Sequence, residues 1–147
     1  MSQKKIVPTA HQGGILQWKA YRILEQALEK PMKKHGVSAP EWKLLGLVYD
    51  AQEILATEVA LLMDVKLPLV TRNVGTLKKK GFITIKKHSQ DKRAKCIAIS
   101  PAGEKKLIAI DTDVRKAIGA VFKTATKNEF DAYKTVLVKI IQNGSSC

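Results

Sequence analysis

The sequence predicts a mainly α-helical fold that carries one small β-hairpin. Apolar residues recur at spacings of three and four over most of the 147 residues, which is the period of an amphipathic helix. Capping sequences precede several of these stretches. Only the segment from about 81 to 99 replaces that period with two short runs rich in isoleucine around a polar turn.

Composition limits the class of protein. Hydrophobic residues make up 45%, enough for a buried core, whereas aromatic residues at 5% argue against stacking of single-stranded bases. The 26 Lys and Arg against 13 Asp and Glu give a net charge of +13, which favours a polyanionic partner but also fits a solvated basic surface. No stretch approaches the roughly 20 apolar residues of a membrane span, and the first 14 residues lack the apolar run of a signal peptide. We therefore expect a cytoplasmic protein with no membrane contact.

The N-terminal third predicts an arm and two helices. Residues 1–13 show no apolar period and are expected to form a flexible arm. A helix over 15–35 carries a wide apolar arc and ends at Gly36. Ser38 and Glu41 have the spacing of a capping box, which opens a second helix that ends near residue 50.

Two further short helices are predicted over 55–64 and 67–80, joined by a turn of three residues. Apolar residues mark the inward side of each, and Pro68 suits the first turn of the second helix. Two short helices with such a turn describe a helix-turn-helix, whose second helix enters the major groove of DNA. Its outward residues are the candidates for DNA contact: Pro68, Leu69, Thr71, Arg72, Thr76 and Lys79.

The two strands, 81–88 and 95–99, enclose a strongly basic tip. A basic hairpin beside a recognition helix is a wing, and Arg93, braced by Asp91, suits a narrow minor groove. Cys96 is expected to face outward here, where neighbouring cations would lower the pKa of its thiol, although an incidental thiol is the simpler interpretation. The predicted wing residues are Lys86, Lys87, His88, Asp91, Lys92, Arg93 and Lys95.

The C-terminal third predicts two helices. Ser100 caps the first, and Thr126 with Glu129 caps the second, which runs to about residue 142. The segments 15–35 and 104–142 carry apolar faces beyond what the middle module can cover, so we expect a symmetric dimer. The predicted dimerisation residues are Leu16, Trp18, Ile23, Val121, Phe130, Tyr133, Leu137 and Ile140.

These motifs, in this order and spacing, resemble those of the multiple-antibiotic-resistance regulator (MarR) family. The match runs without gaps from about 54 to 103 and extends more loosely over 15–142. The resemblance implies a single domain over 1–147, with dimerisation helices around a winged helix-turn-helix at 38–103. It also implies a homodimer that reads a roughly palindromic operator in double-stranded DNA and, in many members, releases it when a small, often aromatic, anion binds. The matching segments are 58–60, 70–72, 77–83, 91–94 and 100–103, with Pro40-Glu41-Trp42 at the second helix.

Several positions depart from that family's pattern. Leu55 stands where a hydroxyl cap is usual, and four further leucines, Leu61, Leu62, Leu67 and Leu69, replace polar residues. These leucines leave open a second interpretation, a winged-helix protein-interaction module that has lost base readout.

An enzyme is not expected, because no nucleophile–base set, phosphate-binding glycine loop or metal-ligand spacing is present in the sequence. The sequence thus predicts a ligand-responsive homodimeric repressor without a cofactor, whose effector would be a small aromatic or anionic molecule.

Overall fold

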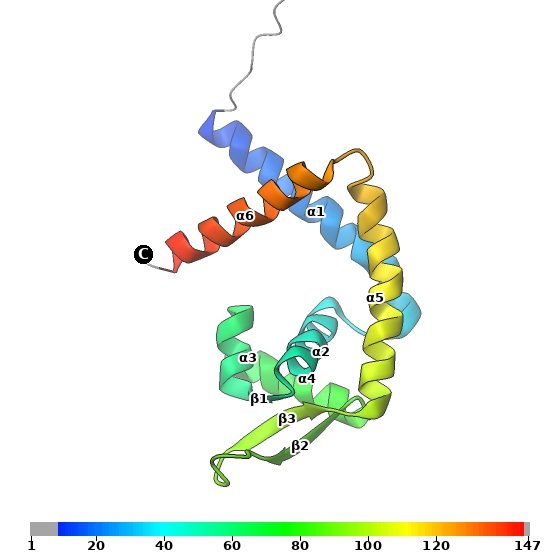
Figure 1. Ribbon diagram of the computed structural model, residues 1–147, viewed down its shortest axis with the longest axis vertical. Helices are drawn as coiled ribbons and strands as arrows, with labels where there is room; N and C mark the ends of the chain where they lie inside the picture. The colour runs from blue at the N-terminus through cyan, green and yellow to red at the C-terminus, as the bar shows by residue number, and fades with distance from the viewer. Residues whose placement is uncertain (1–8, 146–147) are drawn as a thin grey trace, which may run out of the picture.

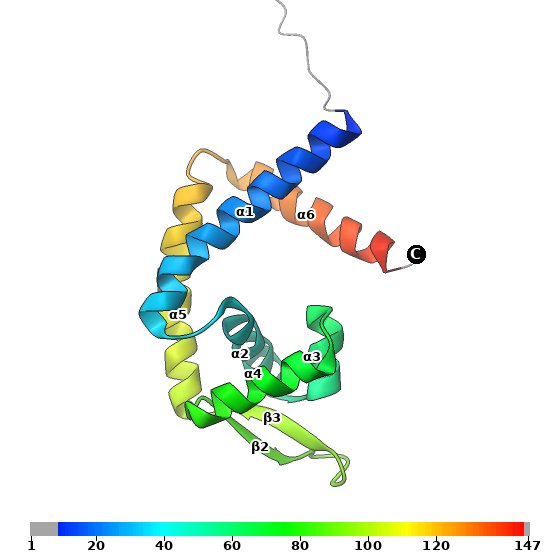
Figure 2. The same ribbon diagram turned by 180° about the vertical axis from the view of Figure 1, so that it is seen from behind.

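The computed structural model describes residues 9–145, which form helices and a small sheet (Figures 1 and 2). This confirms the predicted fold class, mainly α with a β-hairpin. Elements α2 to β3 form one lobe, α5 runs out of that lobe, and α1 and α6 lie at its far end (Figure 1). In chain order the elements are α1 Ala10–His35, α2 Ala39–Ala51, β1 Glu53–Leu55, α3 Ala56–Met63, α4 Leu67–Lys79, β2 Ile83–Lys87, β3 Lys95–Ile99, α5 Pro101–Val121 and α6 Lys127–Gly144.

The predicted caps set the starts of three helices. At α2 the Ser38 hydroxyl accepts from the Glu41 amide at 3.2 Å, and the Glu41 carboxylate accepts from the Ser38 amide at 3.1 Å. The Ser100 hydroxyl accepts from the Gly103 amide at 3.0 Å, and a second capping box opens α6. Each bond satisfies an amide that the first helical turn would otherwise leave without a partner.

The first helix begins earlier than predicted. We expected an arm over 1–13, but α1 starts at Ala10, after Thr9, whose amide donates to the Gln12 side chain at 2.9 Å. The two glycines at 13 and 14 lie inside this helix. Each costs about 1 kcal/mol relative to alanine, which weakens a helix but does not end one. The predicted arm is therefore wrong for residues 10–13, and its first eight residues lie outside the described range.

The hairpin has a third strand that the sequence did not predict. The antiparallel sheet has the order β1-β3-β2, so β3 is central. Cys96 pairs with Leu55 of β1 and Lys86 of β2, and Glu53 pairs with Ala98. Because successive side chains in a strand alternate between faces, Glu53, Lys86 and Cys96 share one face, and Ile97 lies on the other, in the core.

Cys96 is buried, contrary to the expectation of an exposed wing thiol. The carboxylate of Glu53 and the ammonium of Lys86, from the two outer strands, form an ion pair at 3.1 Å that spans the central strand. Burial first, and the Glu53 carboxylate second, raise the pKa of the Cys96 thiol. The predicted lowering by cations is therefore wrong, because the nearest cation is already paired with a carboxylate.

Two apolar clusters hold the molecule together. The larger lies in the lobe and contains the predicted inward residues of the helix-turn-helix, among them Val59, Val70 and Leu77. The smaller joins α1 to α5 through Met32, Val37, Ile110 and Val114.

Polar and aromatic contacts link the remaining helices. Lys34 and His35 of α1 each lie 2.7 Å from the Asp113 carboxylate of α5, and their hydrogen bonds lower its pKa to about 2. The start of α6 packs on the end of α5, where the Phe122 ring meets Phe130 edge-on at 5.0 Å.

Candidate nucleic-acid interface

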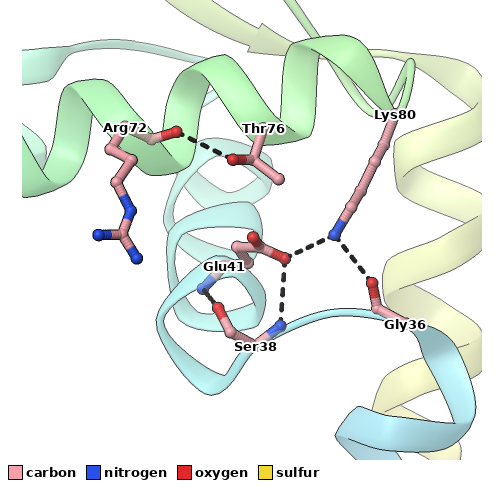
Figure 3. Close-up of polar contacts among 6 residues, drawn as sticks. All are labelled: Gly36, Ser38, Glu41, Arg72, Thr76 and Lys80. Atoms are coloured by element: carbon pink, nitrogen blue, oxygen red, sulfur yellow. Dashed lines mark hydrogen bonds and ion pairs between the residues drawn. The ribbon is translucent and has the colours of Figure 1, made fainter.

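The recognition helix α4 is fixed at its C-terminal end by a lysine. The Lys80 ammonium donates to the Gly36 carbonyl at 2.8 Å and to the Glu41 carboxylate at 2.9 Å (Figure 3). Glu41 is only 7% exposed, so this ion pair neutralises a buried charge that also caps α2. Sequence reasoning missed this contact, because it joins residues 39 positions apart.

The outward face of α4 is exposed as predicted at Pro68, Leu69, Thr71, Arg72 and Lys79, whereas Thr76 is half-buried. In Figure 3 the Arg72 side chain extends from the helix, and among the described residues it has no ion-pair partner. The hydroxyls of Thr71 and Thr76 donate back to carbonyls one turn earlier, each at 3.1 Å. These hydroxyls keep only acceptor capacity, so Arg72 is the strongest donor on this face.

The turn of the wing is shaped by two of the predicted site residues. The His88 ring Nδ1 accepts from the amides of Gln90 and Asp91, each at 3.2 Å. The Asp91 carboxylate accepts from the Arg93 amide at 3.0 Å. The predicted brace is thus present, but it holds the Arg93 backbone and leaves the guanidinium unbound. His88 and Asp91 therefore set the path of the turn.

The cations of the wing fall into two groups. Four of them, Lys87, Lys92, Arg93 and Lys95, are exposed and make no ion pair with any residue in the range 9–145. Lys86 differs, because it pairs with Glu53. Sequence reasoning missed Glu53, since its strand is too short to show an alternating pattern.

A cleft of about 800 Å³ lies between α2, the α3–α4 turn and α5. Its apolar wall includes Leu62 and Leu69, and Leu69 belongs to the exposed face of α4. The indole of Trp42 donates to the Asp111 carboxylate across the cleft at 2.8 Å. The lining also contains two cations, Lys43 and Arg115, and a second carboxylate, Asp50. Segments this far apart in sequence gave no local signal of the cleft.

Large apolar side chains remain exposed on α1 and α6. Of the predicted dimerisation residues, Leu16, Trp18, Ile23, Val121, Tyr133 and Ile140 are exposed, while Phe130 and Leu137 are half-buried. No residue of α6 is fully buried in the single chain. Exposed apolar residues that the prediction did not name extend the same surfaces: Ile15, Tyr21, Val136, Val138 and Ile141.

No helix in the described range combines the length and hydropathy needed to cross a membrane. Within that same range, no group of three or more His, Cys, Asp or Glu side chains is placed to hold a metal ion.

Known proteins show the same sequence pattern and fold. The sequence profile of the MarR family matches residues 35–94. An uncharacterised HTH-type transcriptional regulator of Bacillus subtilis, YdcH, is 27% identical over 120 residues, which cover 79% of this chain and 82% of YdcH.

Solved structures share the fold. A cysteine-to-serine mutant of Escherichia coli MarR in complex with operator DNA superposes with a TM-score of 0.76 at 20% identity, over 86% of this chain and 91% of that one. CouR of Rhodococcus jostii, bound to p-coumaroyl-CoA, superposes with a TM-score of 0.81 at 20% identity, over 86% of this chain and 90% of CouR. BpsR of Bordetella bronchiseptica, whose DNA binding is regulated by 6-hydroxynicotinic acid, superposes with a TM-score of 0.79 at 16% identity, over 92% of this chain and 96% of BpsR. The profile match, the curated relative and the shared fold agree with the predicted motifs, and all of them show that this chain is similar to the MarR family of transcriptional regulators.

Proposed function

We propose that the protein is a ligand-responsive, homodimeric repressor that binds double-stranded DNA through α4 and the wing. The observation that carries this proposal is the unpaired Arg72 on the exposed face of α4, in the same lobe as a wing with four unpaired cations. A guanidinium presents two parallel donors that match the acceptors on the major-groove edge of guanine. Cations on a hairpin beside the recognition helix match the phosphates next to the groove.

The exposed residues then take different roles. We assign base reading to Arg72 and to contacts from Thr71, Pro68 and Leu69, and phosphate contact to Lys79. Arg93 enters a minor groove, and the other unpaired wing cations bind phosphates. His88 and Asp91 act through the shape of the turn, since their polar atoms already accept from its amides, and Thr76 acts through its place on the helix, since it is half-buried whereas Thr71 is exposed.

Binding to duplexes selected from fragmented genomic DNA tests this assignment. Arg72→Ala should cost about 1–3 kcal/mol on the selected duplex and relax the base preference. Arg93→Ala should weaken binding to all duplexes and lower the slope of log affinity against log salt by about 0.9 per phosphate lost. Lys116→Ala on α5, an equal loss of charge at an exposed position outside both elements, is the matched control. A double Arg72 and Arg93 variant that binds as well as the wild type would refute the assignment.

The proposed dimer pairs the segments 15–35 and 104–142 of two chains and leaves 38–103 to bind DNA. The exposed apolar side chains of α1 and α6 support it, because a single chain leaves them in water. Sedimentation should show two chains for the wild type. Trp18→Glu and Ile140→Glu should each reduce the sedimenting mass to that of one chain. Leu61→Glu, at an exposed leucine of α3, should leave it at two chains. Monomeric wild type at the concentrations used for DNA binding would contradict the dimer.

The proposed effector is a small aromatic molecule with an anionic group, bound in the cleft between α2, α4 and α5. Trp42 and Tyr49 offer aromatic surface there, and Arg115 and Lys43 offer cations. Two relatives of the same fold act with p-coumaroyl-CoA and 6-hydroxynicotinic acid. Titration of the intrinsic tryptophan fluorescence with 6-hydroxynicotinic acid and p-coumaric acid tests the cleft. Arg115→Ala should weaken any saturable quenching, and Lys123→Ala, an exposed cation outside the lining, should not.

The leucines favour a second candidate, a protein-interaction module without DNA readout. Leu61 and Leu62 of α3 are 81% and 63% exposed, more than any leucine that packs on the core. A partner captured independently of salt, by a protein that shows no salt-dependent duplex binding, would favour this candidate. A reporter repressed from the selected operator in the presence of the protein, and released by effector, would favour the repressor.

A further inference from the structure

The ion pair between Glu53 and Lys86 lies across the base of the wing. The two side chains come from the outer strands β1 and β2 and meet at 3.1 Å on the face of the sheet opposite to the core. Cys96, on the central strand between them, has no exposed surface. The pair therefore forms a lid over the thiol, and it joins the wing to the strand that leads directly into α3.

Glu53 is an unusual group for this place. On this face of the sheet Glu53 lies beside one cation, Lys86, and the next residues along the two paired strands, Lys87 and Lys95, lie on the other face. Hydrogen bonds from Lys86 and then from Ser89 lower the pKa of the Glu53 carboxyl, so it is ionised at neutral pH. A carboxylate on a DNA-binding face repels phosphate, and the apolar core on the opposite face of the sheet does not require it.

Lys86 is paired with Glu53 but is not buried. Its side chain is 52% exposed, whereas that of Glu53 is 23% exposed. An ion pair with one exposed member is weak, because water screens it, and a DNA phosphate can compete for the same ammonium. The Ser89 and Cys96 side chains also lower the pKa of Glu53, so polar neighbours other than Lys86 favour its ionised form.

We propose that Glu53 sets the affinity of the protein for duplex DNA by withholding Lys86 from phosphate. The carboxylate and the DNA backbone compete for one ammonium, so Lys86 contributes less to binding than the unpaired cations beside it. Glu53 acts as a positioning residue, through Lys86, and needs no contact with DNA. This inference rests on the proposed DNA-binding function.

Salt titration of duplex binding tests it with Glu53→Gln, which removes the charge and keeps the size of the side chain. The released Lys86 should add about 0.9 to the salt slope, and the gain in affinity over wild type should fall about 3.5-fold between 50 and 200 mM salt. Glu53→Gln should have no such effect in a Lys86→Gln background. Glu29→Gln, an equal charge change at an exposed position of α1, is the control. In the wild-type background, Lys86→Gln should lower the slope by less than Lys87→Gln does.

Thiol accessibility gives a readout without DNA. In a Cys147→Ser background, Glu53→Gln should raise the rate at which a water-soluble maleimide modifies Cys96, because the lid opens, while the thermal unfolding midpoint shows whether the fold is kept. An unchanged slope in Glu53→Gln, or an equal gain in affinity in the Lys86→Gln background, would overturn the inference, since the carboxylate would then act by its charge alone or not at all. Wild-type protein without salt-dependent duplex binding would instead refute the proposed function, and the maleimide rates would still report on the lid.

Discussion

Gly103→Ala should destabilise the protein strongly, although alanine is the better helix former. Gly103 lies in the first turn of α5, against the segment that joins α4 to β2. A Cβ atom placed there would lie 1.9 Å from the Phe82 carbonyl oxygen and 3.0 Å from a side-chain carbon of Ile99. Ordinary contacts begin at about 3.4 Å, so this carbonyl must move by more than 1 Å.

The cost follows from what that carbonyl does. It accepts from the Ser100 amide at 3.0 Å, immediately before α5. Overpacking of a filled site costs about 1–3 kcal/mol, and a disrupted hydrogen bond at a poorly hydrated position costs about as much again. Alanine regains about 1 kcal/mol of helix propensity. The expected net loss is about 3 kcal/mol, or roughly 10 °C in the unfolding midpoint for a chain of this length.

Urea and thermal unfolding at fixed protein concentration would measure it, since a dimer makes the midpoint depend on concentration. Gly119→Ala is the matched control on the same helix, because no atom lies within 4 Å of the position that its Cβ would occupy, and it should gain up to about 1 kcal/mol. A Gly103→Ala protein as stable as the wild type would refute the argument from the Phe82 carbonyl.

Three further outcomes are expected. Glu41→Ala should lower the free energy of unfolding in urea by about 2–3 kcal/mol, because it removes half of the α2 capping box and the buried partner of Lys80; Glu29→Ala should change it little. The Asp113 carboxyl has its pKa lowered to about 2 by Lys34 and His35, so its stabilising effect is complete above the unfolded pKa of 3.8 and is lost as pH falls toward 2. Thermal midpoints between pH 5 and 2 should therefore fall more steeply in the wild type than in Asp113→Asn, and parallel curves would contradict this. In a Cys147→Ser protein, Cys96 should react with a thiol reagent only as urea unfolds the chain, because burial raises the pKa of its thiol; fast reaction without urea would show that the sheet face is open.

Local signals in the sequence predicted much of the fold. Capping boxes such as Ser38 with Glu41 predicted helix starts, and the apolar stripe of α4 predicted its buried side, because both depend on residues within one or two turns. The lack of an apolar period misled the prediction at the start of α1, where Thr9 and Gln12 fix the first turn and the glycines at 13 and 14 weaken the helix without ending it.

Features that depend on distant segments were missed. Strand β1 has three residues and exists through its pairing with β3, more than 40 positions later. The same pairing buries Cys96, and a comparable long-range contact gives Lys80 its role. In the candidate site, the residue types on α4 and the wing were predictable from spacing. The sequence did not predict which cations are already paired within the chain, because those pairs depend on Glu41 and Glu53, which come from other elements.

The direct succession of β3 and α5 has a mechanical consequence. Only Ser100 separates the central strand of the wing from a helix of 21 residues, and Gly103 seats that helix against the lobe without room for a methyl group. At 1.5 Å per residue α5 is a rod of about 30 Å, so a tilt of about 5° at one end displaces the other by about 3 Å. That displacement is close to the roughly 3.4 Å between successive bases along a DNA strand. A small change of angle among the distal helices would therefore reach the lobe as a displacement of about this size, and the close contact at Gly103 couples the start of α5 to the lobe.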